Sequence, residues 1–96
     1  MPQPTAVPVH TSLLVSGIYP NPAHDYVFVG MALNQPKDLT FTLYNMAGRQ
    51  LSSDHFALSA GNHKIRIPIV HPVPGTYLLS IRDQDGYVMQ RKVVVE

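Results

Sequence analysis

Apolar and polar residues alternate along most of this chain with a period of two, which is typical of half-buried β-strands. No stretch of the sequence shows the helical spacing of apolar residues over three turns. The alternation predicts strands over residues 11–18, 26–31, 39–44, 49–57, 64–69, 77–82 and 87–95. Clusters of Gly, Pro, Asn and Asp predict turns at residues 20–25, 45–48, 60–62, 71–75 and 83–86. The chain is therefore expected to be all-β.

About seven short strands, with turns about 8–12 residues apart, predict a small Ig-like β-sandwich of antiparallel strands. A barrel of similar strands fits the same pattern. In a sandwich, the inward side chains of the two sheets fill one core. The residues expected to face it are Val27, Val29, Leu39, Phe41, Leu43, Leu51, Ile65, Ile67, Tyr77, Leu79, Ile81, Val88 and Val93.

Length and composition limit the chain to one folded domain. Of its 96 residues, 45% are apolar and 14% are charged, which is enough apolar surface for a core and too little charge for a disordered chain. Three prolines in residues 1–10 predict a linker, so that residues 1–16 form a linker with a possible first edge strand and residues 17–96 form the domain. A net charge of +1 gives no electrostatic basis for a nucleic-acid partner.

The ends and the redox chemistry of the chain add two expectations. The chain has no cysteine, which excludes disulfides and thiolate chemistry, and no apolar run approaches the roughly 20 residues of a membrane-spanning helix. Residues 1–4 carry neither the basic nor the apolar region of a secretory signal. We therefore expect Met1 to be an initiator added to a domain excised from a longer protein.

No catalytic or metal-binding constellation is evident in the sequence. Histidine occurs at positions 10, 24, 55, 63 and 71 without the spacing of a zinc site, and we interpret these residues as solvated turn histidines. Asp83 and Asp85 resemble a fragment of a calcium loop, but Val94 stands where the distal glutamate would fall, so an acidic β-turn is expected. No serine has the glycines of a nucleophile elbow. We expect no catalytic residue, no metal, no cofactor and no enzyme activity.

The most informative segment is Tyr19-Pro20-Asn21-Pro22-Ala23, followed after one residue by Asp25. The two prolines fix their own φ angles and bias the residues before them toward extended backbone. The Asp25 side chain is expected to accept hydrogen bonds from nearby N–H groups and to close the turn. The segment therefore predicts a rigid hinge between the first two strands.

Three further motifs follow the hinge in order. They are Leu43-Tyr44-Asn45-Met46-Ala47-Gly48, Pro74-Gly75-Thr76-Tyr77-Leu78-Leu79-Ser80-Ile81 and Arg91-Lys92-Val93-Val94-Val95-Glu96. Together the four motifs resemble those of the C-terminal sorting domains of type IX secretion cargo, over roughly residues 18–96. Tyr19, Pro20, Asn21, Pro22, Asp25, Asn45, Gly48, Gly75, Tyr77 and the loop residue Gly86 are expected to be signature and turn residues that preserve the fold.

This resemblance implies a non-catalytic label on a longer cargo protein of a Gram-negative bacterium. The cargo would reach the periplasm by ordinary export, cross the outer membrane through the type IX translocon and end at the cell surface or in the medium. The implied partners are translocon or shuttle proteins and a sortase-like peptidase that removes the domain and joins the cargo to anionic lipopolysaccharide. Cleavage is expected within residues 1–16, because linkers are accessible to peptidases.

The end of the chain is the expected recognition element, namely Arg91, Lys92, Val93, Val94, Val95 and Glu96. A receptor could add a strand to an exposed sheet edge or grip this terminal strand. Arg91 and Lys92 have an alternative interpretation, in which charge protects an edge strand against aggregation.

Three alternatives to a cleaved label remain open from the sequence. The domain could be an uncleaved part of the secretion machinery that binds anionic lipopolysaccharide, a structural spacer, or an adhesive, carbohydrate-binding sandwich that uses Tyr19, Asn21, Tyr44 and Asn45. Tyr19, Tyr44, Tyr77 and Tyr87 are interpreted mainly as packing residues. A monomer is expected, with some tendency to form strand-swapped dimers through the hinge.

Overall fold

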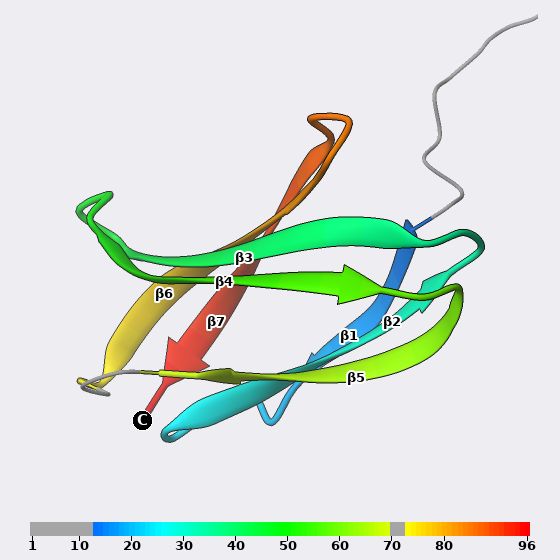
Figure 1. Cartoon of the computed structure of the whole chain (residues 1–96). Coiled ribbons are helices and arrows are strands. Elements are labelled where there is room, and N and C mark those ends of the chain that lie inside the picture. Colours follow the sequence, from blue (N-terminus) through cyan, green and yellow to red (C-terminus); the bar gives the residue numbers. More distant parts are fainter. Residues whose placement is uncertain (1–12, 70–72) are drawn as a thin grey trace, which may run out of the picture.

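The computed structural model describes residues 13–69 and 73–96 and contains seven strands and no helix within these ranges. They are β1 (Leu13–Tyr19), β2 (Tyr26–Leu33), β3 (Lys37–Asn45), β4 (Gln50–Leu58), β5 (Gly61–Pro68), β6 (Gly75–Asp83) and β7 (Val88–Val95). All strand pairs are antiparallel, and they form a three-stranded sheet in the order β1-β2-β5 and a four-stranded sheet in the order β4-β3-β6-β7. The all-β sandwich prediction is confirmed, and Figure 1 shows its two layers.

The strand alternation places one face of each sheet in a common core. Leu39, Phe41 and Leu43 are buried along β3, while Thr40 and Thr42 between them are partly exposed on the outer face. Buried residues of both sheets form a single cluster. The sandwich is stabilised because each sheet buries its apolar face against that of the other. Because the fourth strand pairs with β3, the sheet order differs from that of a constant-type Ig domain, in which the fourth strand joins the first, second and fifth.

The predicted core is correct except at two positions. Leu51 is only partly buried against the core, and Val88 is 41% exposed because it lies on the outer face of β7, opposite the exposed Arg82. Six buried apolar core residues were not predicted, and most lie at strand ends or in turns, where alternation is weakest. They are Leu13, Ala23, Met31, Leu33, Ile69 and Val95.

Several predicted boundaries shift. Gly61 and Asn62 were expected in a turn but begin β5, because β2 continues to Leu33 and offers main-chain partners to both. Gly75, expected in a turn, begins β6 opposite Val95. The first strand runs from Leu13 to Tyr19 across the expected boundary at residues 16 and 17, and it forms an edge of its sheet. Residues 11, 12, 71 and 72 of the predicted elements lie outside the described residues.

Candidate functional site

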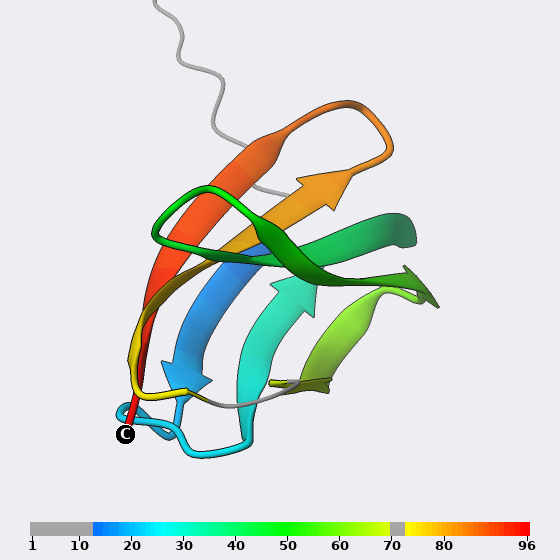
Figure 2. The same ribbon diagram turned by 90° about the vertical axis from the view of Figure 1, so that its left-hand side faces the viewer.

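The hinge, residues 20–25, lies against the end of the last strand. Ala23 is fully buried and forms an isolated parallel bridge with Val95. The Ala23 N–H donates to Val94 O at 2.7 Å, and the Glu96 N–H donates to Ala23 O at 2.9 Å. Figure 2 shows the chain end beside the loop that joins β1 to β2. The first and last sequence motifs, 72 residues apart, therefore form one surface.

Hinge side chains extend this contact. Asn21 Oδ1 accepts a hydrogen bond from the Val94 N–H at 3.3 Å, and His24 Nδ1 lies 3.1 Å from Glu96 O, where the ring nitrogen is the donor. Asp25 was expected to close the turn through its side chain, but it is the Asp25 carbonyl that accepts a hydrogen bond, from the Ile69 N–H at 2.8 Å. The peptide bonds before Pro20 and Pro22 are both cis.

The predicted recognition residues fall into two groups on β7. Val93 and Val95 are buried in the core, so they are not available to a receptor that reads the folded domain. Lys92 is exposed on the outer face of the sheet, opposite Leu78, and Glu96 is exposed beyond the strand. The sequence could not separate the two groups, because a short apolar run gives no direction to its side chains.

Arg91 has a distinct geometry. It pairs with the buried Leu79, which places it on the core-facing side of β7, yet it remains exposed because β7 is an edge strand. Its Nη1 donates to Gln90 O at 3.0 Å. An inward-pointing charge is one way in which natural sheets protect an edge, so this geometry favours the protective interpretation for Arg91.

The two middle motifs meet across the four-stranded sheet. Asn45 pairs with Tyr77, and Tyr77 pairs in turn with Val93. Asn45 Oδ1 accepts from the N–H groups of Ala47 at 3.0 Å and Arg49 at 2.9 Å, while Gly48 adopts a φ of 85° in the same turn. The buried Tyr77 donates its hydroxyl to Val73 O. These contacts support the fold-preserving role predicted for the middle motifs.

All four motifs therefore gather at one end of the sandwich. Besides the bridges already described, Gly75 at the start of β6 pairs with Val95 at the end of β7. An open groove of about 550 Å³ lies at this end, with Asn45, Arg49, Leu51 and Tyr77 among its lining residues. The sequence predicted each motif separately, but their convergence depends on the sheet order.

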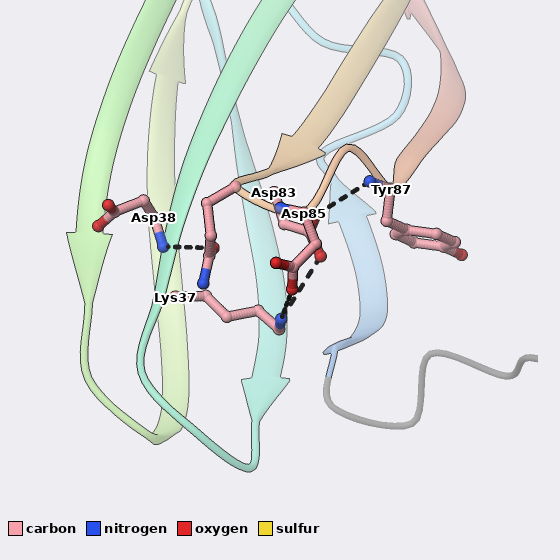
Figure 3. Close-up of polar contacts among 6 residues, drawn as sticks. Lys37, Asp38, Asp83, Asp85 and Tyr87 are labelled. Carbon is pink, nitrogen blue, oxygen red and sulfur yellow. Dashed lines mark hydrogen bonds and ion pairs between the residues drawn. The ribbon is translucent and has the colours of Figure 1, made fainter.

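The acidic turn holds an ion pair that the sequence analysis did not find. Lys37, 3% exposed, places Nζ 3.4 Å from Asp83 Oδ2 and 3.7 Å from Asp85 Oδ2 (Figure 3). Asp83 Oδ1 accepts from the N–H groups of Asp85 and Tyr87, both at 2.9 Å. The expected β-turn is present, and its first aspartate is engaged in the turn and the ion pair. Lys37 continues the inward alternation of Leu39 and Phe41, but the predicted strand began at Leu39 and a lysine is expected at the surface, so its burial was not predicted.

The environment of Asp83 changes its acidity. Burial raises the pKa of Asp83, but the hydrogen bonds from the Tyr87 and Asp85 N–H groups and the charge of Lys37 outweigh burial, so that this pKa lies below its ordinary value. The carboxylate thus stays charged at neutral pH. Its role here is structural, since it fixes the β6–β7 turn to the start of β3.

The remaining candidate residues are dispersed. Within the described ranges, no group of three or more His, Cys, Asp or Glu could hold a metal ion. His55 lies within β4, as the strand predicted over residues 49–57 implies, and His63 lies within β5 instead of a turn. His10 and His71 lie outside the described residues. In the same ranges, no helix has the length and apolar character to cross a membrane.

The tyrosines proposed for an adhesive patch do not share a face. Tyr19 is 42% exposed on the outer face of the three-stranded sheet, opposite Phe28. Tyr44 is half-buried on the outer face of the other sheet, opposite Leu78. Tyr87 is half-buried against the core. The patch imagined from the sequence is therefore not assembled.

These features define a small antiparallel β-sandwich whose hinge and last strand meet at one end. Residues 17–96 match the family of secretion system C-terminal sorting domains, and the chain belongs to this family. It is a type IX secretion C-terminal sorting signal, and the protein that carries it is secreted or displayed at the cell surface. No curated protein matches the chain.

Proposed function

We propose that this domain is the label of a longer cargo and that translocon or shuttle proteins read it in its folded form. The reading surface is the end of the sandwich where the hinge meets β7, with Lys92 and Glu96 as its accessible charges. The observation that carries the proposal is the main-chain clamp of Ala23 between Val94 and Glu96. This clamp joins the first and last motifs of the family into one surface that only the folded domain presents.

After translocation, a sortase-like peptidase removes the domain at the cell surface and joins the cargo to anionic lipopolysaccharide. Leu13 is 3% exposed and pairs with Leu33, so a peptide bond inside β1 would require the strand to open. We therefore place the cleavage before Leu13, within the first part of the linker predicted from the sequence. Intact-mass analysis of exported protein checks this, and a new terminus inside β1 or a later strand would contradict it.

A reporter assay tests the recognition surface. Residues 1–96 are fused to a fluorescent protein with an ordinary export signal and expressed in a type IX-competent bacterium and its translocon-deficient sibling. Lys92→Glu and the double variant Asn21→Ala/His24→Ala are expected to reduce surface fluorescence, and only in the competent strain. Arg82→Glu makes the same charge change as Lys92→Glu on an exposed residue of the same sheet, and it should be exported normally.

The choice of variants matters because deletion of residues 93–96 removes Val93 and Val95 from the core. Such a deletion would stop export through unfolding as readily as through loss of recognition. Each variant is therefore checked by circular dichroism. Normal export of folded Lys92→Glu and of the hinge double variant would reject the proposed surface, and retention of the unaltered fusion in both strains would reject the label function.

A further inference from the structure

The outer face of the three-stranded sheet carries a compact set of aromatic and basic side chains, which we call the cationic face: Tyr19, Tyr26, Phe28, Lys64 and Arg66. Strand register brings them together, because Tyr19 pairs with Phe28 and Phe28 pairs with Arg66. The Phe28 ring centroid lies 5.9 Å from that of Tyr19 and 5.2 Å from that of Tyr26. The face adjoins the hinge, because Tyr19 and Tyr26 flank residues 20–25, but it covers the outer side of the three-stranded sheet and includes no residue of β7.

Both basic groups rest on aromatic rings. Lys64 Nζ lies 4.5 Å from the centroid of Phe28, and the Arg66 guanidinium carbon lies 4.7 Å from the centroid of Tyr26. Cation–π contacts of this kind orient the charged groups without neutralising them. Arg66 is thereby held with its planar set of donors available for bidentate contact with a carboxylate.

Charge is segregated around this face. Strands β1, β2 and β5 contain no aspartate or glutamate, although the chain has six acidic residues in all. In the described part of the chain, the ion pairs are those that Lys37 makes with Asp83 and Asp85. Lys64 and Arg66 are exposed and form no such pair there. A nearly neutral domain therefore presents two oriented cations on one acid-free sheet face.

Gly30 leaves room beside the aromatic residues of this face. Gly30 pairs with Lys64, and a Cβ added at Gly30 would lie 3.7 Å from Tyr19 Cε1 and 2.8 Å from Ser16 Oγ. The glycine therefore allows these side chains to lie close to the sheet. Tyr and Arg around the central Phe28 are residue types that dominate binding energy at protein interfaces.

We propose that the cationic face docks an acidic, extended segment of a partner protein. The charge of the face is complementary to carboxylates, and Arg66 supplies the bidentate contact. A carbohydrate is disfavoured as the occupant because sugars stack on bare rings, whereas Lys64 and Arg66 already occupy faces of Phe28 and Tyr26. The basic residues of this face lie on β5, whereas the reading surface proposed above uses the hinge and β7, so different substitutions test the two proposals.

A titration of the ¹⁵N-labelled 96-residue chain with poly-L-glutamate, followed by NMR amide shifts at 150 mM salt, tests the proposal. We expect shifts confined to β1, β2 and β5, and a loss of affinity of about tenfold or more in Lys64→Ala/Arg66→Ala, as removal of charged hydrogen bonds predicts. Arg66→Lys keeps the charge but not the planar donors, so its affinity should lie between those of the unaltered chain and the double variant. Arg82→Ala, on the other sheet, should leave the affinity unchanged.

Three outcomes would overturn the proposal: amide shifts that are absent, amide shifts that spread over both sheets, or amide shifts that persist in the folded double variant. Alginate, an anionic polysaccharide without peptide groups, provides the second arm of the experiment. If alginate shifted the same amides with equal or higher affinity per charge, the occupant would be an acidic glycan and the protein-docking proposal would be wrong.

Discussion

Ala23 and Val95 lie side by side as a parallel bridge, although one belongs to the hinge and the other ends the last strand. Both are buried, at 0% and 2% exposure. Val95 is thus held by Gly75 of β6 on one side and by the hinge on the other. A substitution in the hinge should therefore disturb the end of β7 and lower the stability of the whole domain.

Ala23→Leu should destabilise the domain by about 1–3 kcal/mol, because extra methylenes in a packed site force neighbouring groups apart. The site is fully buried and its main chain is hydrogen-bonded on both sides, so the larger side chain has no route to solvent. Urea unfolding followed by circular dichroism gives the midpoint. Ala47→Leu is the control, since Ala47 is exposed in the β3–β4 turn and should tolerate the same substitution.

Asn45→Ala should cost about 1–3 kcal/mol, since two hydrogen bonds of about 0.5–1.5 kcal/mol each are lost with the Oδ1 acceptor. Those bonds come from the Ala47 and Arg49 N–H groups and fix the turn between β3 and β4. Asn45→Asp retains an oxygen at the same place and should lose much less. If thermal unfolding showed the same loss of stability for both variants, the Asn45 amide nitrogen, and not the Oδ1 acceptor, would be the group that stabilises the turn.

Asp83 should make stability depend on acid pH. Its pKa is lower in the folded than in the unfolded chain, so the unfolded state binds more protons in this range and stability rises with pH. The contribution is complete above the ordinary carboxyl pKa and is lost as the pH falls through the lower folded value. Unfolding free energies measured between neutral pH and strongly acidic pH should show this decline.

Asp83→Asn should remove that part of the pH dependence. It should also cost about 3 kcal/mol at neutral pH, the lower end for breaking a buried ion pair, because Asp85 still neighbours Lys37. The amide oxygen can still accept from the turn N–H groups, so the loss reports the charge. Asp38→Asn, at an exposed side chain, serves as the control, and an unchanged acid profile in Asp83→Asn would contradict the assignment.

Gly48→Ala should destabilise by about 1–2 kcal/mol, because a φ of 85° brings a Cβ too close to the following carbonyl. A clash with the rest of the protein is not the cause, since no atom beyond Gly48 and its two chain neighbours lies within 4 Å of the added carbon. Gly17 has equally open space and no such φ, so Gly17→Ala should be neutral or slightly stabilising. Calorimetric melting temperatures that fall by the same amount for both would show that backbone strain is not the reason.

The end of the sandwich where the four motifs meet shows which features the sequence could predict. The hinge prolines, the Asn45 turn and the strand alternation could each be recognised, because each depends on residues close together in the chain. The sequence did not indicate that Ala23 would be buried, since a single alanine between prolines and polar residues carries no periodic signal. Its burial follows from contact with a strand that lies 72 residues away.

Lys37 and Val88 are two single positions whose burial was not predicted correctly from the sequence. A lysine is expected at the surface, and Lys37 is buried only because the β6–β7 turn brings Asp83 to it. Val88 is expected inside, and it is exposed because it pairs with the exposed Arg82 on the outer face of the sheet, in phase with Lys92. Side-chain type predicts average burial, whereas strand register and tertiary contacts decide the individual case.

By itself, the sequence determined the all-β class, most of the core, the turn chemistry and the family motifs, because periodicity and local backbone preference are properties of neighbouring residues. Only the tertiary structure decided which strands form each sheet, that the four motifs meet at one end, and that Lys64 and Arg66 share an acid-free face. These relationships depend on strand order and register across long sequence separations. Many registers satisfy the same local pattern, and the packing of the whole core selects one.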